Sequence, residues 1–291
     1  MKRIFPFIVL ALFCSAPPSS AVTHHVGQDG VARGYELNET IYGSADGDTI
    51  LVYPGTYVGA YIYAASKDLV IRSVEGPEKT ILDGDKALMV AWFLHVTDKT
   101  VLEGFTIRNG YDPRFSGGIR CGGDAIIRNN IIEGCQSGWG GGVYVAPQKK
   151  PTIEGNLFRN NISTTAGGGI YAQFSRPVIR NNTFVGNNAE IGGDDIALYG
   201  TSAVVENNLF TGNKGLSSIY LKGDKNEITL DCNAFWNIKG QWIAGEKGAV
   251  IPEDGNRKTA DPGFADTQSY SLGASSPYGK SCSCGPIGWR Y

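Results

Sequence analysis

Short segments of alternating apolar and polar residues recur along the chain at intervals of 25 or 26 residues. One apolar track comprises Leu102, Ile127, Ile153, Ile179, Val205 and Leu230. A second track follows five residues later and comprises Ile107, Ile132, Phe158, Phe184, Phe210 and Phe235. Each segment is only three to five residues long, which is typical of strands and not of helices, whose apolar residues recur every three or four positions over longer stretches.

A third apolar segment, usually preceded by glycines, completes each repeat. Its copies are GGIRC from Gly117, GGGVYV from Gly140, GGGIYA from Gly167, GGDDIAL from Gly192 and SSIYL from Ser217. Three short strands per repeat and one turn of chain per repeat predict a parallel β-helix, a solenoid whose coils stack at roughly 4.8 Å. The predicted fold is therefore all-β and single-stranded, with about 26 residues and three short strands in each coil.

Two further rows of residues, one at an outward position and one at a bend, provide independent tests of this alignment. The residue after the first track carries a charge of alternating sign over most coils, in the order Arg72, Glu103, Arg128, Glu154, Arg180, Glu206 and Asp231. Opposite charges on neighbouring strands stabilise a sheet, and a one-residue slip would expose the core, so this row is predicted to fix the register. A second row is predicted to form a ladder of stacked amides at a bend, where asparagine tolerates the left-handed backbone; it comprises Asn130, Asn156, Asn182, Asn208 and Asn233.

The chain is predicted to have four parts. Residues 1–21 resemble a signal peptide, because Lys2 and Arg3 precede a short apolar stretch and small residues lead to a cleavage site after Ala21. Residues 22–47 are predicted to cap the N-terminal end, residues 48–239 to form the β-helix, and residues 240–291 to fold over the last coil. We therefore expect a secreted monomer, in the periplasm or outside the cell, without a transmembrane segment.

Candidate capping side chains occur at both ends. The segment from Arg33 to Gly47 is amphipathic, with apolar or aromatic residues at Tyr35, Leu37, Ile41 and Tyr42. In the tail, Trp242, Phe264 and Trp289 are predicted to hold the chain against the last coil. Both ends of an open β-helix need such protection because their strand edges are otherwise unpaired.

Composition excludes some classes of protein. The formal net charge is −2 and 19% of residues are charged, so no basic surface indicates a nucleic-acid partner. Forty glycines beside 42% apolar residues favour many tight turns over disorder. Cleavage would leave five cysteines, which we expect to be structural disulfides or buried thiols with the pairing left open; they are Cys121, Cys135, Cys232, Cys282 and Cys284.

Several segments resemble a known group of proteins. The stretches GDTILVYPGTY from Gly47 and DLVIRSVEGPEKTILDG from Asp68 resemble the first coils of the pectin-lyase-like superfamily. The GGGIYA and PVIRNNTFVGN units resemble the right-handed parallel β-helix repeat family, and the tail resembles closing segments of secreted bacterial members. The resemblance implies a right-handed β-helix over about residues 40–290 and an activity on polysaccharides, although shared fold is not shared function.

One outward row of the third strand is the main candidate binding surface. In successive coils it comprises Arg120, Tyr144, Tyr171, Ala197 and Tyr220. Tyrosines one coil apart are predicted to form a flat, open strip with a dip at Ala197, because flanking glycines leave room above it. Aromatic faces pack against the apolar faces of sugars, and phenol hydroxyls form hydrogen bonds, so the strip is a candidate polysaccharide site. The alternative is a tyrosine ladder that only stabilises the solenoid.

Two adjacent carboxylates, Asp194 and Asp195, replace the turn glycines of neighbouring coils. They are candidates to hold a cation such as Ca²⁺, and Asp195 is also a candidate to bind a sugar hydroxyl; the alternative is a solvated turn. A third cluster of charged residues, which could bind or act on a uronate, comprises Arg108, Asp112, Arg114 and Lys222. No cofactor other than this possible Ca²⁺ is predicted.

Three functions remain open from the sequence, the last of which is a purely structural role in the cell envelope. The first is a non-catalytic surface protein that binds polysaccharide through Arg120, Tyr144, Tyr171, Tyr220 and Asp195. The second is a polysaccharide lyase that works by β-elimination on a uronate-containing glycan, with Arg120 or Lys222 as the base and a cation on Asp194 and Asp195. The first is favoured because the carboxylates are few for a calcium-dependent lyase.

Overall fold

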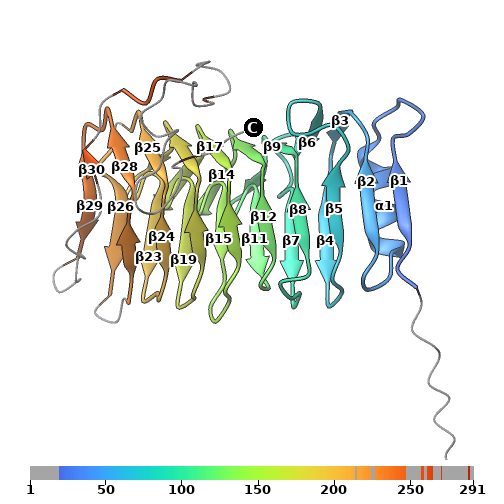
Figure 1. The fold of residues 1–291 in the computed structure, drawn as a ribbon, viewed down its shortest axis with the longest axis horizontal. Helices are drawn as coiled ribbons and strands as arrows, with labels where there is room; N and C mark the ends of the chain where they lie inside the picture. The colour runs from blue at the N-terminus through green and yellow to red at the C-terminus, as the bar shows by residue number, and fades with distance from the viewer. Residues whose placement is uncertain are drawn as a thin grey trace, which may run out of the picture.

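The computed structural model describes residues 20–213, 215–223, 227–246, 257–258, 261–264, 270 and 288. Most of the predicted signal peptide and most of the tail, including Cys282, Cys284 and Trp289, lie outside the described residues. Figure 1 shows that the chain winds into a solenoid in which strands of consecutive coils lie side by side along the long axis. Three long parallel sheets and a fourth, shorter sheet form its sides.

Each sheet takes one strand from each successive coil. Sheet A contains β1 (Thr23–Val26), β2 (Thr49–Val52), β5 (Val70–Ser73), β8 (Val101–Glu103), β12 (Ile126–Arg128), β16 (Thr152–Glu154), β20 (Val178–Arg180), β24 (Val204–Glu206) and β27 (Thr229–Asp231). Sheet B contains β3 (Gly55–Val58), β6 (Thr80–Asp83), β9 (Thr106–Arg108), β13 (Ile131–Glu133), β17 (Leu157–Arg159), β21 (Thr183–Val185), β25 (Leu209–Thr211), β28 (Ala234–Trp236) and β30 (Arg257–Lys258).

The remaining two sheets form the third side of the coil and the turn that leads to it. Sheet C contains β4 (Ile62–Ala65), β7 (Ala91–Leu94), β11 (Ile119–Gly122), β15 (Val143–Val145), β19 (Ile170–Gln173), β23 (Ile196–Tyr199), β26 (Ser217–Lys222) and β29 (Gln241–Gly245). Sheet D contains β10 (Tyr111–Asp112), β14 (Gln136–Trp139), β18 (Ile162–Ala166) and β22 (Asn188–Ala189), and it precedes sheet C in each coil.

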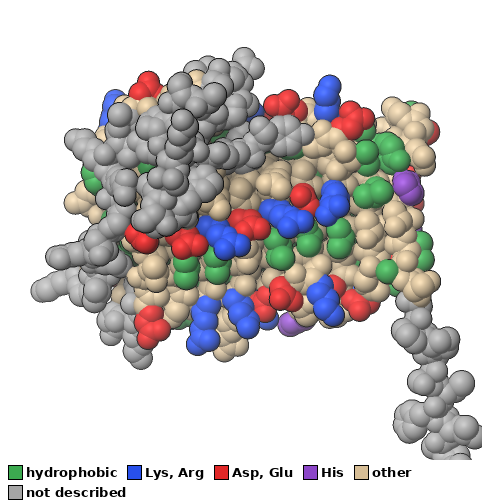
Figure 2. All heavy atoms as spheres, viewed as in Figure 1, with side chains coloured by type: hydrophobic (Ala, Val, Ile, Leu, Met, Phe, Trp, Pro, Cys, Tyr) green, Lys and Arg blue, Asp and Glu red, His purple; other side chains and the backbone are tan. Residues whose placement is uncertain are grey.

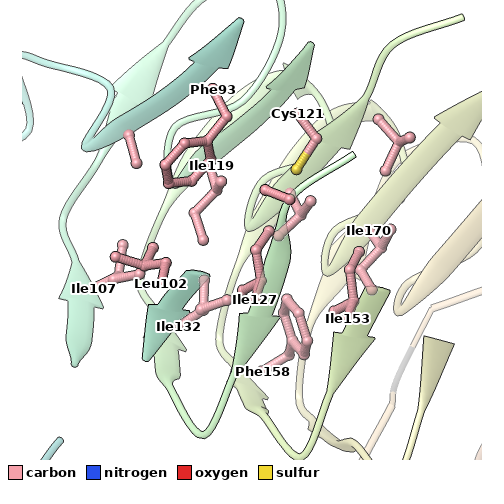
Figure 3. Packing of buried hydrophobic residues seen from close by; sticks show 14 of the residues in the cluster. Phe93, Leu102, Ile107, Ile119, Cys121, Ile127, Ile132, Ile153, Phe158 and Ile170 are labelled. Carbon is pink, nitrogen blue, oxygen red and sulfur yellow. The ribbon is translucent and has the colours of Figure 1, made fainter. Parts of the chain in front are cut away.

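The predicted inward tracks form the core. Ile127, Ile153 and Ile179 are partners across adjacent strands of sheet A, and all three are fully buried. Figure 3 shows such residues from different sheets pointing into one interior. Four phenylalanines of sheet B, from Phe158 to Phe235, continue the second track as a stack with ring centroids 4.8–5.0 Å apart. The repeat and its register are therefore confirmed.

The charge row of sheet A lies in the predicted register. Arg72 and Arg128 bind the same Glu103 carboxylate at 3.1 and 3.0 Å, and Arg180 binds Glu154 at 2.7 Å. Figure 2 shows the face that carries this row, with blue and red side chains alternating along the solenoid. These ion pairs link neighbouring coils, which supports the structural role predicted for the row.

The predicted asparagine ladder links sheets A and B. The Asn156 amide, for example, donates to the Ile127 carbonyl at 2.9 Å and to Asn182 Oδ1 at 3.0 Å. One detail of the prediction is wrong, because the left-handed residue is the one before the ladder, as at Asn129 and Asn181 with φ of 54° and 55°. The preceding residue makes the bend, and the ladder amide turns inward to bind buried carbonyls.

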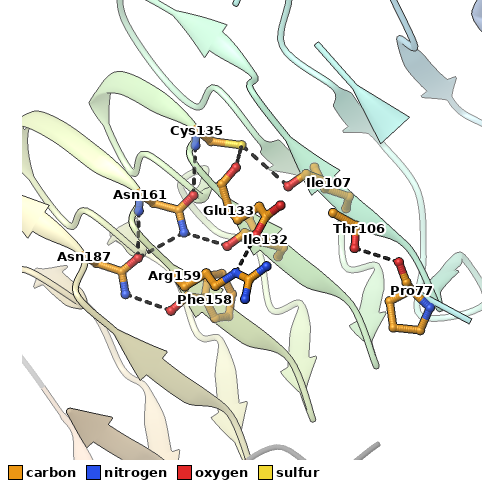
Figure 4. Close-up of polar contacts among 10 residues, drawn as sticks. All are labelled: Pro77, Thr106, Ile107, Ile132, Glu133, Cys135, Phe158, Arg159, Asn161 and Asn187. Atoms are coloured by element: carbon orange, nitrogen blue, oxygen red, sulfur yellow. Dashed lines mark hydrogen bonds and ion pairs between the residues drawn. The ribbon is translucent and has the colours of Figure 1, made fainter. Parts of the chain in front are cut away.

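Sheet B carries a second set of ladders that the sequence analysis missed (Figure 4). Asn161 donates to the Ile132 carbonyl at 2.8 Å and to Asn187 Oδ1 at 3.0 Å, while the Arg159 guanidinium binds Glu133. Two coils earlier, Arg108 binds Asp83 at 2.7 Å. The proposed cluster of Arg108 with Lys222 is therefore wrong, because they lie on sheets B and C and Arg108 completes an ion pair.

A short helix, α1 (Gly34–Gly43), covers the N-terminal end of the solenoid. Leu37 and Ile41 are buried and join the core, whereas Tyr35 and Tyr42 are exposed. The Lys67 ammonium binds three carbonyl oxygens at the end of the helix, those of Ile41, Tyr42 and Ser44, at 2.6–2.9 Å. Cations at a helix C-terminus are favourable because they bind carbonyls that lack partners within the helix.

The described part of the tail contacts the last coil and one side of the solenoid. Trp242 in β29 stacks on Phe235 with centroids 5.4 Å apart, which extends the phenylalanine stack by one ring. Phe264 contacts Trp236 on sheet B, and Tyr270 packs on the outward residues Leu157 and Val185 of earlier coils. The predicted role of Trp242 at the last coil fits this stack, while Trp289 lies outside the described residues.

Two of the six cysteines, Cys121 and Cys135, are free thiols inside the solenoid. Burial raises the pKa of both thiols, that of Cys135 to about 12, so neither is a reactive thiolate at neutral pH. Of the two alternatives that the sequence left open, these two residues are buried thiols. Disulfides among the other cysteines stay a prediction with their pairing open, because Cys282 and Cys284 lie outside the described residues.

Candidate functional site

The outward row of sheet C is longer than predicted. The five predicted residues are partners on consecutive strands, and two further aromatic residues, Tyr63 and Trp92, continue the row toward the N-terminus. These two residues do not stand out in the sequence because the first coils are 28 or 29 residues long, as the steps from Tyr63 to Trp92 and from Trp92 to Arg120 show. We call the whole row, from Tyr63 to Tyr220, the sheet C column.

The middle of the sheet C column is covered and not open. Tyr144 and Tyr171 stack on each other at 5.9 Å and are only 3% and 5% exposed. Phe115 lies 4.8 Å from the ring of Tyr144, and Trp139 lies 4.8 Å from that of Tyr171. The expected open strip is therefore wrong here, because Phe115 from the turn before β11 and Trp139 at the end of β14 fill the space that the glycines leave.

Burial also changes the chemistry of these phenols. Desolvation raises the pKa of Tyr144 and, more strongly, that of Tyr171, so both rings are neutral at any physiological pH. Gln173 donates a hydrogen bond to the Tyr144 hydroxyl. The two tyrosines consequently support the surface and offer a ligand little more than the edges of their rings.

Arg120 lies between two aromatic rings. Its guanidinium carbon is 4.6 Å from the centroid of Trp92 and 4.1 Å from that of Phe115. Stacking of this kind holds the planar group by cation–π attraction on both faces. A guanidinium in this arrangement is a fixed cation that can donate from its edges, but it stays protonated in proteins, which argues against Arg120 as a catalytic base.

A pocket lies where the sheet C column is interrupted. Ala197, the smallest residue of the column, stands between Tyr171 and Tyr220, and the missing ring leaves a space of about 120 Å³. The pocket is lined by Trp139, Ala166, Tyr171, Ile191, Ala197, Leu198, Tyr199, Tyr220 and Lys222. The dip predicted at Ala197 is thus the floor of an aromatic pocket, which we call the Ala197 pocket.

Polar groups occur at one end of the Ala197 pocket. Lys222 forms an ion pair with Glu246 at 3.0 Å, and its ammonium lies 5.6 Å from the centroid of the Tyr199 ring. The Tyr220 hydroxyl donates to the same Glu246 carboxylate at 3.3 Å. The pocket therefore combines flat apolar walls with hydroxyl, ammonium and carboxylate groups at its rim, which is the arrangement that recognises polar molecules with apolar faces.

Asp194 and Asp195 do not lie on the surface. Both are fully buried behind β23. The Asp194 carboxylate accepts from the Ala189 and Gly215 N–H groups at 3.1 and 3.0 Å. The Asp195 carboxylate accepts from the amides of Asn187 and Asn213. The expected solvated turn and the expected sugar contact of Asp195 are both wrong.

Burial determines the protonation of this pair. Desolvation raises the pKa of Asp194, and it raises that of Asp195 well above the usual range, with the neighbouring Asp194 adding to the effect. Both carboxylates are surrounded by N–H donors, which stabilise an anion or a neutral acid and not a metal ion. Among the described residues no group of three His, Cys, Asp or Glu side chains could hold a metal. The Ca²⁺ role of Asp194 and Asp195 stays a prediction.

A second aromatic groove lies at the N-terminal end of the same sheet. It is lined by Asn38, Glu39, Tyr42, Tyr61 and Tyr63. The rings of Tyr61 and Tyr63 are parallel within 3°, with centroids 6.1 Å apart, and Tyr42 on α1 is 84% exposed. Asn38 fixes the helix to the segment before β4 by donating to the Gly59 carbonyl and accepting from the Tyr61 N–H, at 3.2 and 2.7 Å. No sequence pattern indicated this groove, because it joins a helix to a strand of the first coil.

Comparison with known proteins defines the class of the fold. Residues 91–235, about half of the chain, match the family described as "Right handed beta helix region". With the sheet topology above, the chain is a right-handed parallel β-helix, as the sequence predicted. No curated protein matches the sequence. No helix in the described part of the chain is long and apolar enough to cross a membrane.

Two solved structures are similar to this chain over most of their length. One is the pectin methylesterase PemA from Erwinia chrysanthemi, with 12% identity and a TM-score of 0.40, covering 90% of this chain and 99% of that chain. Another is a pectin methylesterase in complex with a hexasaccharide, with 11% identity and a TM-score of 0.32, at the same coverage. At such low identity and TM-score these similarities do not bear on the function of this chain.

Proposed function

We propose that this protein is a secreted polysaccharide-binding β-helix and that sheet C is its contact surface. The observation that carries the proposal is the Ala197 pocket, an aromatic cavity in a column that is otherwise closed by stacking. Sugar rings have apolar faces that pack against aromatic side chains and hydroxyl edges that bind polar groups. The walls formed by Trp139 and Tyr220 and the rim formed by Lys222 and Glu246 offer both kinds of contact.

The geometry of the solenoid favours an extended ligand over a small one. The Ala197 pocket and the groove at Tyr61 and Tyr63 lie on one sheet, with four strands between β4 and β23. At roughly 4.8 Å per strand step, five steps separate them by about 24 Å. A linear polysaccharide could contact both, and Arg120 lies between them as a fixed cation. Two linked contacts raise the overall affinity without any new interaction.

The arrangement of the site does not support the lyase alternative. Lys222 is engaged with Glu246, and the guanidinium of Arg120 is held between two rings. The carboxylates that were to hold a cation are buried behind β23 and face N–H donors. Catalysis by Arg120 or Lys222 therefore stays a prediction, and the binding function is the one that we propose.

Calorimetry of the mature protein against plant and bacterial polysaccharides and their oligosaccharides tests the proposal. We expect binding that strengthens with chain length and weakens about tenfold in Tyr220→Ala, since an aromatic contact is worth up to about 1.5 kcal/mol. Tyr35→Ala, which removes an exposed tyrosine of α1 outside both pockets, is the matched control and should bind normally.

Three outcomes would overturn the proposal. Failure to bind any member of a broad glycan array would contradict a polysaccharide-binding role. Formation of unsaturated products that absorb in the ultraviolet would show that the protein is a lyase and that binding alone does not describe it. Equal loss of affinity in Tyr220→Ala and Tyr35→Ala would contradict the Ala197 pocket as the contact.

A further inference from the structure

The first coil contains an ionised carboxylate whose hydrogen bonds are not explained by glycan binding. Asp48 precedes β2 and is only 3% exposed. Its carboxylate accepts from the Val22 N–H, the Ala45 N–H and the His24 ring, each at 2.8 Å. The Val22 bond above all, and then the His24 ring, hold the pKa of Asp48 down to about 2.

Val22 is the residue that the predicted processing would expose. Cleavage after Ala21 hydrolyses the Ala21–Val22 peptide bond, so that water adds its hydroxyl to the Ala21 carbonyl and a proton to the Val22 nitrogen. The Val22 nitrogen then becomes an ammonium group at neutral pH. This is the same atom that lies 2.8 Å from Asp48 Oδ1.

The position of this nitrogen is fixed by the sheet and not by the leader. The Val22 carbonyl accepts from the Thr49 N–H at 2.9 Å, and β1 pairs in register with β2 from Thr23 to Val26. Cleavage on the N-terminal side of Val22 leaves all of these bonds intact. The new ammonium would therefore form beside Asp48 without movement of the coil.

We propose that removal of the leader after Ala21 creates an ion pair between the new α-ammonium of Val22 and the buried Asp48 carboxylate, and that this pair locks the first coil in the processed protein. A neutral N–H with one proton is replaced by a cation with three, and charge-assisted hydrogen bonds are roughly twice as strong as neutral ones. Processing thus stabilises the coil on which the N-terminal cap rests.

The other charged groups at this end do not replace the ammonium. His24 binds the second oxygen, Asp48 Oδ2, and is partly exposed. The Lys67 ammonium is used by the last carbonyls of α1. Asp46 accepts from the Asp68 N–H, and the Asp68 carboxylate accepts from Thr97 and Thr100. Asp48 Oδ1 is thus available to the Val22 nitrogen.

The experiment compares two exported proteins that differ by one residue. Insertion of one glycine between Ala21 and Val22 moves the free amine outward but keeps the neutral Val22 N–H that the structure already accommodates. N-terminal sequencing establishes that both are cleaved after Ala21. We expect the unmodified protein to melt about 2–4 °C higher at pH 7, and Asp48→Asn to abolish the difference between the two forms.

The pH dependence provides a second measurement that does not require the Asp48 variant to fold. An amine paired with a carboxylate has a raised pKa in the folded state, so its stabilisation is present below the unfolded value of about 8 and is lost as pH rises through the folded value. The gap in melting temperature should therefore close as the pH rises through the folded pKa of the amine. Equal melting temperatures at pH 7, a gap that persists at high pH, or cleavage at another residue would each overturn the proposal.

Discussion

Sheets A and C both stack equivalent residues of successive coils in register, but the outward residues of the two sheets have different effects. On sheet A the outward residues of successive coils are Arg and Glu in alternation, and ion pairs such as Arg72–Glu103 and Arg180–Glu154 link neighbouring coils. On sheet C the outward residues are aromatic rings and one arginine that stack until Ala197 interrupts them. The paired charges of sheet A hold neighbouring coils together. On sheet C, the small side chain of Ala197 leaves a pocket between its aromatic neighbours.

The comparison also shows why exposure could not be inferred from register alone. Both rows are outward, yet Glu103 and its arginines remain partly exposed while Tyr144 and Tyr171 are buried by Phe115 and Trp139. The turns that precede sheet C are long enough to fold back over it. The surface available to a ligand is therefore set by those turns as much as by the strands.

The largest expected effect concerns the core that both faces share. Phe184→Ala removes one ring from the stack between Phe158 and Phe210 and leaves a cavity in a solenoid that cannot collapse locally. We expect a loss of about 3–5 kcal/mol in the free energy of unfolding, measured with chemical denaturant. Phe174→Ala, at an aromatic residue that is 53% exposed, is the matched control and should cost far less.

The strand register and the core could be predicted because each depends on one position per coil. The same type of residue recurs at that position in many coils. The apolar tracks, the Arg–Glu row and the Asn130 ladder are of this kind, and all were found from the sequence. The Ala197 dip was found for the same reason, as a departure from a repeated pattern. A second ladder through Asn161 and Asn187 repeats only briefly, so its signal was weak.

The site itself depends on residues that do not repeat. Phe115 comes from the turn before β11, Trp139 from the end of β14 in sheet D, and Tyr42 from a helix outside the solenoid. Asp195 was placed on the surface because a glycine-to-aspartate change looks exposed in sequence. In the structure it points inward and accepts from two ladder amides, a tertiary arrangement that no local pattern indicates.

The second-largest expected effect concerns the buried carboxyl group of Asp195, the residue that directly precedes β23 of sheet C. A carboxyl group whose pKa is raised in the folded state stabilises most at low pH, and its stabilisation falls as pH rises from the unfolded value of about 3.8 through the folded value. Asp195→Asn should remove this slope and be equal to or more stable than the wild type at pH 7, by up to about 2 kcal/mol. Thermal melts from pH 3 to pH 8 measure it.

A loss of stability in Asp195→Asn at every pH, with the slope unchanged, would show that the carboxylate is charged in the fold and that its hydrogen bonds outweigh burial. Asp231→Asn is a suitable comparison, because Asp231 lies at the end of the sheet A row and has an intermediate exposure. Its substitution should change the free energy of unfolding at pH 7 by less than about 1 kcal/mol, since partly exposed pairs contribute little.

The smallest effect concerns the charge row. Arg128→Ala removes one of two arginines on Glu103 and leaves Arg72 in place. We expect a loss of only about 0.2–1 kcal/mol, which shrinks at high salt, because the pair is partly exposed and screened. Denaturant melts at low and high ionic strength measure it. A loss of several kcal/mol would show that sheet A depends on this row for more than register.

The central claim is that a gap in an otherwise closed aromatic column makes sheet C a binding surface. Ala197→Phe fills that gap without removing any residue that lines the pocket walls. Calorimetry with the polysaccharide that the wild type binds should show affinity reduced by at least tenfold, while the melting temperature stays within a few degrees. Undiminished affinity in a folded Ala197→Phe protein would contradict the claim.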